Sequence, residues 1–167
     1  MASRKVRDVD QGYQALVRRF YALEDTPVID VGVLEAEGAK VHEGGPEGDG
    51  TRPVTVLDVA TWNEFGTGQI PERSFIRAWF DENLPGAREL VRRLLESVAA
   101  GKRDLATVPE VLGTTFVAQI QKRMAAGIPP ANAPETIARK GSSTPLIDTG
   151  QLRSSITFRA RPRGYRP

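Results

Sequence analysis

Two blocks of the sequence, residues 62–77 and 144–156, constrain the fold most strongly. Each block has the pattern of a helix end, a glycine turn, an extended step fixed by proline and a return to regular structure. This pattern is typical of a chain that holds a shaped surface, and neither block resembles an active site. Assembly with other protein subunits is therefore the first function to consider.

Length and composition predict one domain that spans residues 1–167. A chain of 167 residues can bury a real core, since chains of roughly this size bury about 70% of their unfolded surface. The absence of cysteine excludes disulfides and Cys-based metal sites. No apolar stretch of signal-peptide or membrane-spanning length follows the basic N-terminus, so we expect synthesis in the cytoplasm and no contact with a membrane.

The spacing of apolar residues predicts an α+β fold, in which a small antiparallel sheet packs against several amphipathic helices. The residues 28–34 and 155–160 are β-branched or alternate in polarity, and we expect these two strands to pair. Glycine marks where helices stop, at Gly66 and Gly127, and Pro85 predicts a kink or a restart. The predicted helices cover about 10–23, 53–65, 74–83, 84–101 and 108–126, with a single turn at 133–140.

Charge is distributed unevenly along the chain, although the formal net charge is only +2. Glycine-rich residues 35–53 predict a long flexible acidic loop, because they cannot bury much apolar surface. Its acids are Glu35, Glu37, Glu43, Glu47 and Asp49. The arginines at 159–167 predict a basic C-terminal arm that runs along a neighbouring subunit.

Signatures of catalysis are few, and we expect no catalytic, cofactor-binding or metal-binding residues. His42 is the only histidine, and it lies in the predicted loop, where a base is difficult to position. Glu64 and Asp148 could form the carboxylate pair of a hydrolase. Glu64 is better explained as a helix-end carboxylate that accepts backbone amides or pairs with Arg73, and Asp148 as the cap of a short turn.

The arginine-rich C-terminal end leaves a second alternative open, a small DNA-associated packaging or architectural protein. A solvated strand face explains the same arginines equally well. Phosphate contacts alone would carry no sequence information.

The two blocks and the segments between them resemble the neck and tail-completion (tail terminator-like) proteins of tailed bacteriophages. The resemblance covers about residues 55–158, and its last segment is the most specific. Ser74 replaces the proline that usually precedes the phenylalanine, and residues 35–53 have no counterpart. The segments that carry it are NEFGT (63–67), IPERSFIR (70–77), IPP (128–130), TIARKGSS (136–143) and PLIDTGQLRSSI (145–156).

The resemblance implies a non-enzymatic virion protein that forms a ring in the head–tail connector (neck) or at the top of the tail. Such a ring would join head to tail around the DNA channel, with a hexamer favoured over a dodecamer. Its partners would be adjacent neck, portal-adaptor or tail-tube proteins, and DNA would pass without sequence-specific contact. The acidic loop 35–53 would either line this channel or dock on an adjacent ring, and a plain solvated insertion is the alternative. A closed ring needs two different, complementary faces on each subunit. We expect these faces to use Glu64, Phe65, Arg73, Phe75, Ile76, Arg77, Asp148, Leu152 and Arg153.

Overall fold

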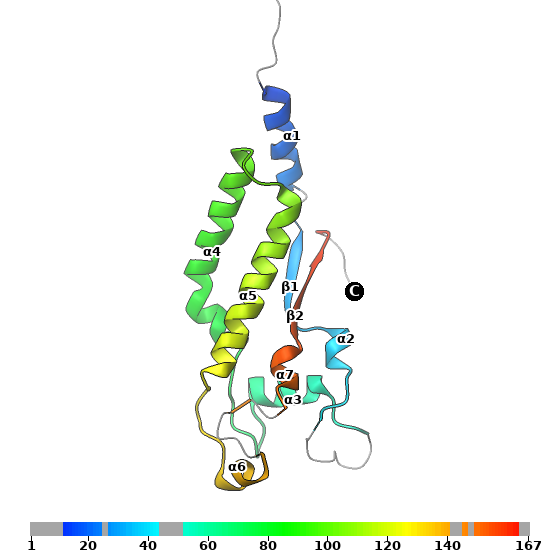
Figure 1. The fold of residues 1–167 in the computed structure, drawn as a ribbon, viewed down its shortest axis with the longest axis vertical. Helices are drawn as coiled ribbons and strands as arrows, with labels where there is room; N and C mark the ends of the chain where they lie inside the picture. Colours follow the sequence, from blue (N-terminus) through cyan, green and yellow to red (C-terminus); the bar gives the residue numbers. More distant parts are fainter. Residues whose placement is uncertain (1–11, 25–26, 44–51, 141–144, 147–148, 164–167) are drawn as a thin grey trace, which may run out of the picture.

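The computed structural model describes residues 12–24, 27–43, 52–140, 145–146 and 149–163. Within them, a two-stranded antiparallel sheet packs against a long helical hairpin, which confirms the predicted α+β class (Figure 1). The elements in chain order are α1 (Tyr13–Glu24), β1 (Val28–Val33), α2 (Glu35–Gly38), α3 (Val56–Phe65), α4 (Arg77–Ala99), the 3-10 turn η1 (Leu105–Thr107), α5 (Val108–Ala125), α6 (Pro134–Lys140), α7 (Gln151–Ser154) and β2 (Ile156–Arg161).

The helical hairpin of α4 and α5 forms the centre of the core. The predicted four-residue steps along α5 are confirmed, because Leu112, Phe116, Ile120 and Met124 are all buried. Trp79 of α4 packs against Phe116, with ring centroids 5.2 Å apart. Of the kink or restart expected at Pro85, the restart is wrong, since α4 continues through this residue. Both halves of α4 contribute buried residues to one apolar face, so packing against the core holds the helix together where proline removes a hydrogen bond.

The two strands pair as predicted, in a register that runs from Val28 opposite Arg161 to Val33 opposite Ile156. Two arginines of β2 meet one carboxylate of β1: Arg161 Nε lies 2.7 Å from Asp30 Oδ2, and Arg159 Nη2 lies 3.6 Å from it. The hydrogen bond from Arg161 is the main reason that the pKa of Asp30 falls below its usual value.

The basic arm was therefore predicted to begin too early. Residues 159–161 belong to β2, because cross-strand hydrogen bonds and the carboxylate of Asp30 hold them there. Residues 164–167 lie outside the described part of the chain.

The prediction of a loop over all of residues 35–53 is also wrong for its described parts. Residues 35–38 form α2, and Val41 pairs with Thr55 through hydrogen bonds that flank the bridge. Gly38 allows α2 to approach α3 closely, since a Cβ at this position would lie 3.2 Å from Leu57 Cβ. Glu47 and Asp49 lie outside the described residues.

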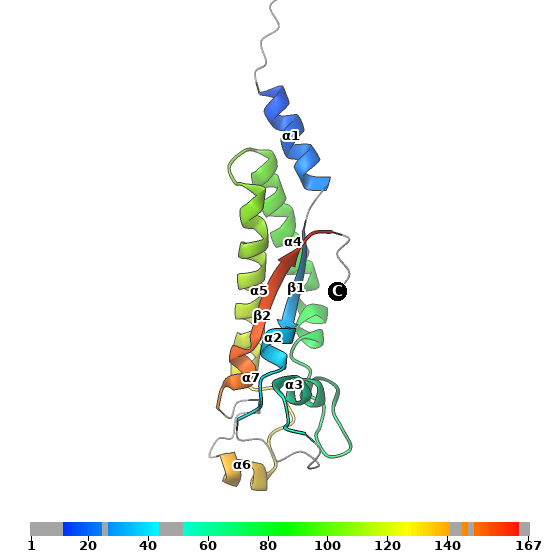
Figure 2. The ribbon, with the colours of Figure 1, turned by 90° about the vertical axis from the view of Figure 1, so that its right-hand side faces the viewer.

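The elements are arranged along one long axis, with α1 at one end and α3 and α6 toward the other (Figures 1 and 2). The α4–α5 hairpin runs between these ends, beside the sheet. None of the described helices combines the length and the apolar character that a membrane span requires.

Candidate functional site

The first block folds into an elbow, residues 63–77, that connects α3 to α4. Its turn depends on Gly66, which has a φ of 73° and ends α3 as the sequence predicts. A Cβ on Gly66 would lie 3.0 Å from the backbone nitrogen of Glu72, so the close approach of the two arms also requires glycine. The hydrogen bond from Arg73 N to Asn63 O, 2.6 Å long, joins the arms of the elbow.

The Glu64 carboxylate holds the elbow from inside. It accepts hydrogen bonds from the backbone nitrogens of Phe75 (2.8 Å), Ile76 (3.1 Å) and Arg77 (2.8 Å), and from Ser74 Oγ (2.7 Å). The N–H groups at the start of a helix have no partner within the helix, and a negative charge there is favourable. Glu64 therefore caps α4 from the end of α3, as the prediction of an amide-accepting carboxylate required.

Ser74 completes this cap. Its hydroxyl donates to Glu64 and accepts a hydrogen bond from Ala78 N at 3.0 Å. The serine thus links the carboxylate to the first turn of α4, which a proline side chain could not do.

Arg73 ties the elbow to the segment that follows α5. Its Nε donates to Pro130 O at 2.8 Å and its Nη2 to Ala131 O at 3.1 Å. The side chain is buried, and burial lowers the pKa of its guanidinium. Arg73 therefore binds two carbonyls. The alternative role expected for Glu64, an ion pair with Arg73, is wrong.

Several residues predicted to form subunit contacts are in fact interior. Phe75 is fully buried, and Leu152, Arg73 and Glu64 are also buried within the chain. Ile76 is half-buried and packs against the core. These side chains shape the surface and do not form it, because their apolar or hydrogen-bonding groups are already used inside the subunit. Asp148 lies outside the described residues, and Gly150 occupies the N-cap position of α7.

Among the exposed residues of the elbow, Arg77 contacts both Phe65 and Glu72, and we call these three residues the elbow patch. Phe65 is 61% exposed, although its side chain is a large apolar group. The Arg77 guanidinium lies 5.1 Å from the centre of the Phe65 ring and pairs with Glu72. A cation over an aromatic ring is a favourable pair, and aromatic and arginine side chains are enriched at protein interfaces. Arg153 of the second block is also exposed.

Gln151 of the second block binds residues 41–43 of the acidic loop, and the sequence did not single out this residue. Gln151 Nε2 donates to Val41 O at 2.9 Å, and its Oε1 accepts from Glu43 N at 2.8 Å. The side chain thus completes the backbone hydrogen bonding of residues 41–43 on the side opposite Thr55. No local pattern could have revealed this contact, because the partners are more than 100 residues apart in sequence.

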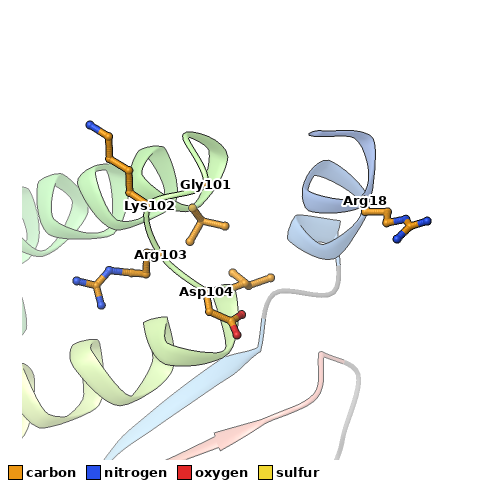
Figure 3. A pocket seen from close by; sticks show the side chains of 7 residues that line it. Arg18, Gly101, Lys102, Arg103 and Asp104 are labelled. Atoms are coloured by element: carbon orange, nitrogen blue, oxygen red, sulfur yellow. The ribbon is translucent and has the colours of Figure 1, made fainter. Parts of the chain in front are cut away.

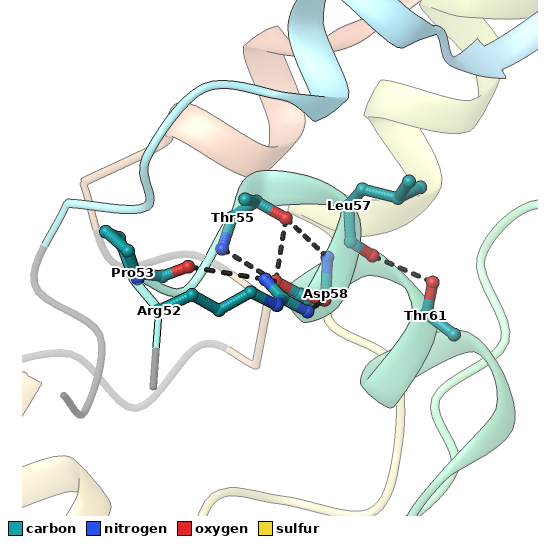
Figure 4. A network of polar contacts seen from close by, with 6 residues as sticks. All are labelled: Arg52, Pro53, Thr55, Leu57, Asp58 and Thr61. Atoms are coloured by element: carbon teal, nitrogen blue, oxygen red, sulfur yellow. Dashed lines mark hydrogen bonds and ion pairs between the residues drawn. The ribbon is translucent and has the colours of Figure 1, made fainter. Parts of the chain in front are cut away.

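A second network fixes the start of α3 (Figure 4). Thr55 and Asp58 form a capping box, and both nitrogens at the end of Arg52 bind the Asp58 carboxylate at 2.6 and 2.7 Å. The hydrogen bond from Arg52, followed by that from the Thr55 backbone, holds the pKa of Asp58 well below its usual value of 3.8. The chain is therefore held by hydrogen bonds just before residues 44–51, at 41–43, and just after them, at 52–55.

A cleft of about 430 Å³ between α1 and the α4–α5 connection offers little chemistry for a ligand. Val98 and Leu105 contribute apolar surface, and the charged side chains of Arg18, Lys102 and Arg103 extend away from the cleft (Figure 3). Small-molecule sites instead have a few polar groups that converge. In the part of the chain that the structure describes, no three His, Asp or Glu residues are placed to hold a metal ion.

Comparisons of the chain with protein-family models, with curated proteins and with solved structures found no match.

Proposed function

We propose that this protein is a structural virion component of a tailed bacteriophage. It forms a ring in the head–tail connector or at the top of the tail, around the DNA channel. Its partners are copies of itself, as a hexamer, and adjacent neck, portal-adaptor or tail-tube proteins. DNA passes through the ring without sequence-specific contact, and the protein has no enzymatic activity.

The elbow is the observation that carries this proposal. Glu64 and Arg73 use their charges inside the subunit to fix the backbone, while Phe65 and Arg77 remain at the surface. Such a rigid, exposed aromatic and cationic patch loses little conformational entropy on binding, which favours a repeated contact between subunits. The same residues lie in the sequence block that resembles the phage proteins.

The described contacts favour this function over the two alternatives. A hydrolase would need Glu64 to reach a substrate, yet both of its carboxylate oxygens accept hydrogen bonds from the start of α4. Two of the arginines that a DNA-binding arm would use, Arg159 and Arg161, pair with Asp30 within the chain. Glu64 and these two arginines therefore have a structural role inside the subunit.

The first test is the oligomeric state of the purified protein, alone and mixed with candidate portal-adaptor and tail-tube proteins. Native mass spectrometry gives the subunit number, and negative-stain imaging shows whether the particles are closed rings. We expect rings of one size. A chain that joins none of these partners and instead binds DNA in a salt-dependent way would contradict the proposal.

A pair of matched variants tests the role of the elbow patch. Phe65→Ser should prevent ring formation while leaving the helical content unchanged, because Phe65 contributes its exposed ring and not core packing. Leu84→Ser is the control, since Leu84 is also an exposed apolar residue, on α4. Normal rings from the Phe65 variant would show that the patch is not a subunit contact.

A further inference from the structure

Helix α1 carries an exposed aromatic stripe at the end of the molecule away from the elbow. Tyr13 is 73% exposed and Tyr21 is 66% exposed, and the half-buried Val17 lies between them at four-residue spacing. Arg18, beside this stripe, is exposed and points away from the cleft that α1 shares with the α4–α5 connection (Figure 3). We call Tyr13, Val17, Arg18 and Tyr21 the α1 stripe; it is aromatic and basic.

The packing of α1 within its own chain is slight. The helix has 12 residues and packs mainly against α4, at one end of the molecule (Figures 1 and 2). Helices shorter than about 12–15 residues are marginal in water unless tertiary packing supports them. The α1 stripe would supply such packing if another surface covered it.

Residues 35–43 offer a surface whose chemistry is complementary to that of the α1 stripe. Val41 is 58% exposed, and the acids Glu35 and Glu43 near it in sequence are exposed as well. The bridge to Thr55 and the two hydrogen bonds from Gln151 hold the backbone of residues 41–43. We call Glu35, Val41 and Glu43 the acidic edge; it is apolar and negative, and it is already ordered before any partner binds.

One subunit cannot bring these two surfaces together. The six-residue strand β1 lies between α1 and α2 in the chain, and an extended strand of this length spans about 20 Å. The two helices accordingly lie beyond opposite ends of β1 in both views (Figures 1 and 2). The acidic edge that meets an α1 stripe must belong to a second copy.

We propose that the α1 stripe of one copy binds the acidic edge of the next copy. Tyr13 and Tyr21 cover Val41, and Arg18 pairs with Glu43. The contact joins two different surfaces, so it can repeat from copy to copy. It rests on the proposed function only for closure of the ring, since the contact itself needs no more than two copies.

Charge reversal provides the test, with self-association measured by sedimentation velocity over a range of concentrations. Arg18→Glu and Glu43→Lys, each alone, should weaken association at least about tenfold, and the chain that carries both changes should recover most of that loss. Glu43 binds Gln151 through its backbone nitrogen, so the change of side chain leaves this bond in place. Asp81→Lys, an equal change of charge at an exposed site on α4, is the control and should have no effect.

A cross-link identifies the partner directly. A photoreactive residue at position 21, in a mixture of ¹⁴N- and ¹⁵N-labelled protein, should give peptides of mixed label that join α1 to residues near Val41. Four results would each overturn the proposal. The first two are cross-links found only within single chains and a wild-type chain that stays monomeric at every concentration. The other two are association that neither Arg18→Glu nor Glu43→Lys changes, and a double variant that associates no better than the single ones.

Failure of this contact and failure of the proposed function give different results. Closed rings that Phe65→Ser abolishes and Arg18→Glu leaves intact would overturn the α1 contact and retain the connector function. Open chains or dimers that respond to charge reversal as expected would support the α1 contact and contradict the ring.

Discussion

Glu64 determines the shape of the elbow through one side chain. A carboxylate can accept several hydrogen bonds at once, whereas an amide has a single oxygen and turns N–H donors toward its neighbours. Glu64 is buried, so a substitution that leaves any N–H donor at the start of α4 without a partner is costly. The sequence suggested this role from the position of Glu64 at a helix end.

We expect Glu64→Gln to lower the free energy of unfolding by about 1–3 kcal/mol, because it leaves buried N–H groups at the start of α4 unsatisfied. Chemical denaturation measures the change. Glu72→Gln removes an equal charge from an exposed ion pair in the same elbow and should cost less than about 1 kcal/mol. Equal losses in the two variants would mean that the four hydrogen bonds to Glu64 contribute little.

Asp58 should make the start of α3 sensitive to acid. Asp58→Asn removes the ion pair with Arg52 and weakens the capping box, so it should cost about 1 kcal/mol at pH 7. The folded-state pKa of Asp58 lies below the usual value of 3.8, so its contribution to stability is present above that pH and is lost as the pH falls through the folded pKa. Denaturation at a series of pH values should therefore show the wild type and the variant converging in acid; a constant difference would contradict this explanation.

At the scale of elements, one glycine decides how α5 meets the sheet. The Phe158 ring of β2 lies directly on Gly113 of α5, where a Cβ would come within 2.1 Å of a ring carbon. The sequence places a glycine within this helix, but it does not show which side chain occupies the space above it. Close packing of the sheet on α5 depends on this position.

Gly113→Ala should destabilise the protein by about 1–3 kcal/mol, because the extra methyl group forces Phe158 out of its site. Gly86→Ala in α4 is the matched control, since nothing lies within 4 Å of a Cβ there. That change should stabilise the protein by about 0.5–1 kcal/mol through higher helix propensity. Thermal unfolding should show melting temperatures that move in opposite directions. If both rose, the close contact between Phe158 and Gly113 would be wrong.

At the scale of the whole molecule, stability should be distributed unevenly along the long axis. α5 contributes the largest set of buried residues and packs against α4, β1 and β2, whereas α1 packs mainly against one end of α4. Elements with few buried contacts open at low free energy, and core helices open only near global unfolding.

Amide hydrogen exchange should therefore be fastest for α1 among the longer helices of the isolated subunit and slowest for α5. Assembly should slow the exchange of α1 selectively, because the proposed contact covers its aromatic stripe. The α4–α5 hairpin is the internal control, since its exchange should change little. Equal protection of α1 before and after assembly would show that α1 gains no partner.

The sequence alone determined the sizes and positions of most elements. Repeated apolar spacing marked α3 and α5, the turn glycines Gly66 and Gly127 marked where these helices stop, and β-branched runs marked the two strands. These signals are local, since helical and strand periods are set by backbone geometry over a few residues. The α+β class followed from them, and so did the amide-accepting role of Glu64.

Only the tertiary structure decided which residues of the two blocks face outward. Phe65 and Phe75 look equally suited to an interface in the sequence, yet one is exposed and the other is fully buried. Arg73 meets the carbonyls of residues 130 and 131, and Gln151 meets residues 41 and 43. Each of these contacts joins segments more than 50 residues apart, and no local pattern encodes them because they exist only once the core has brought those segments together.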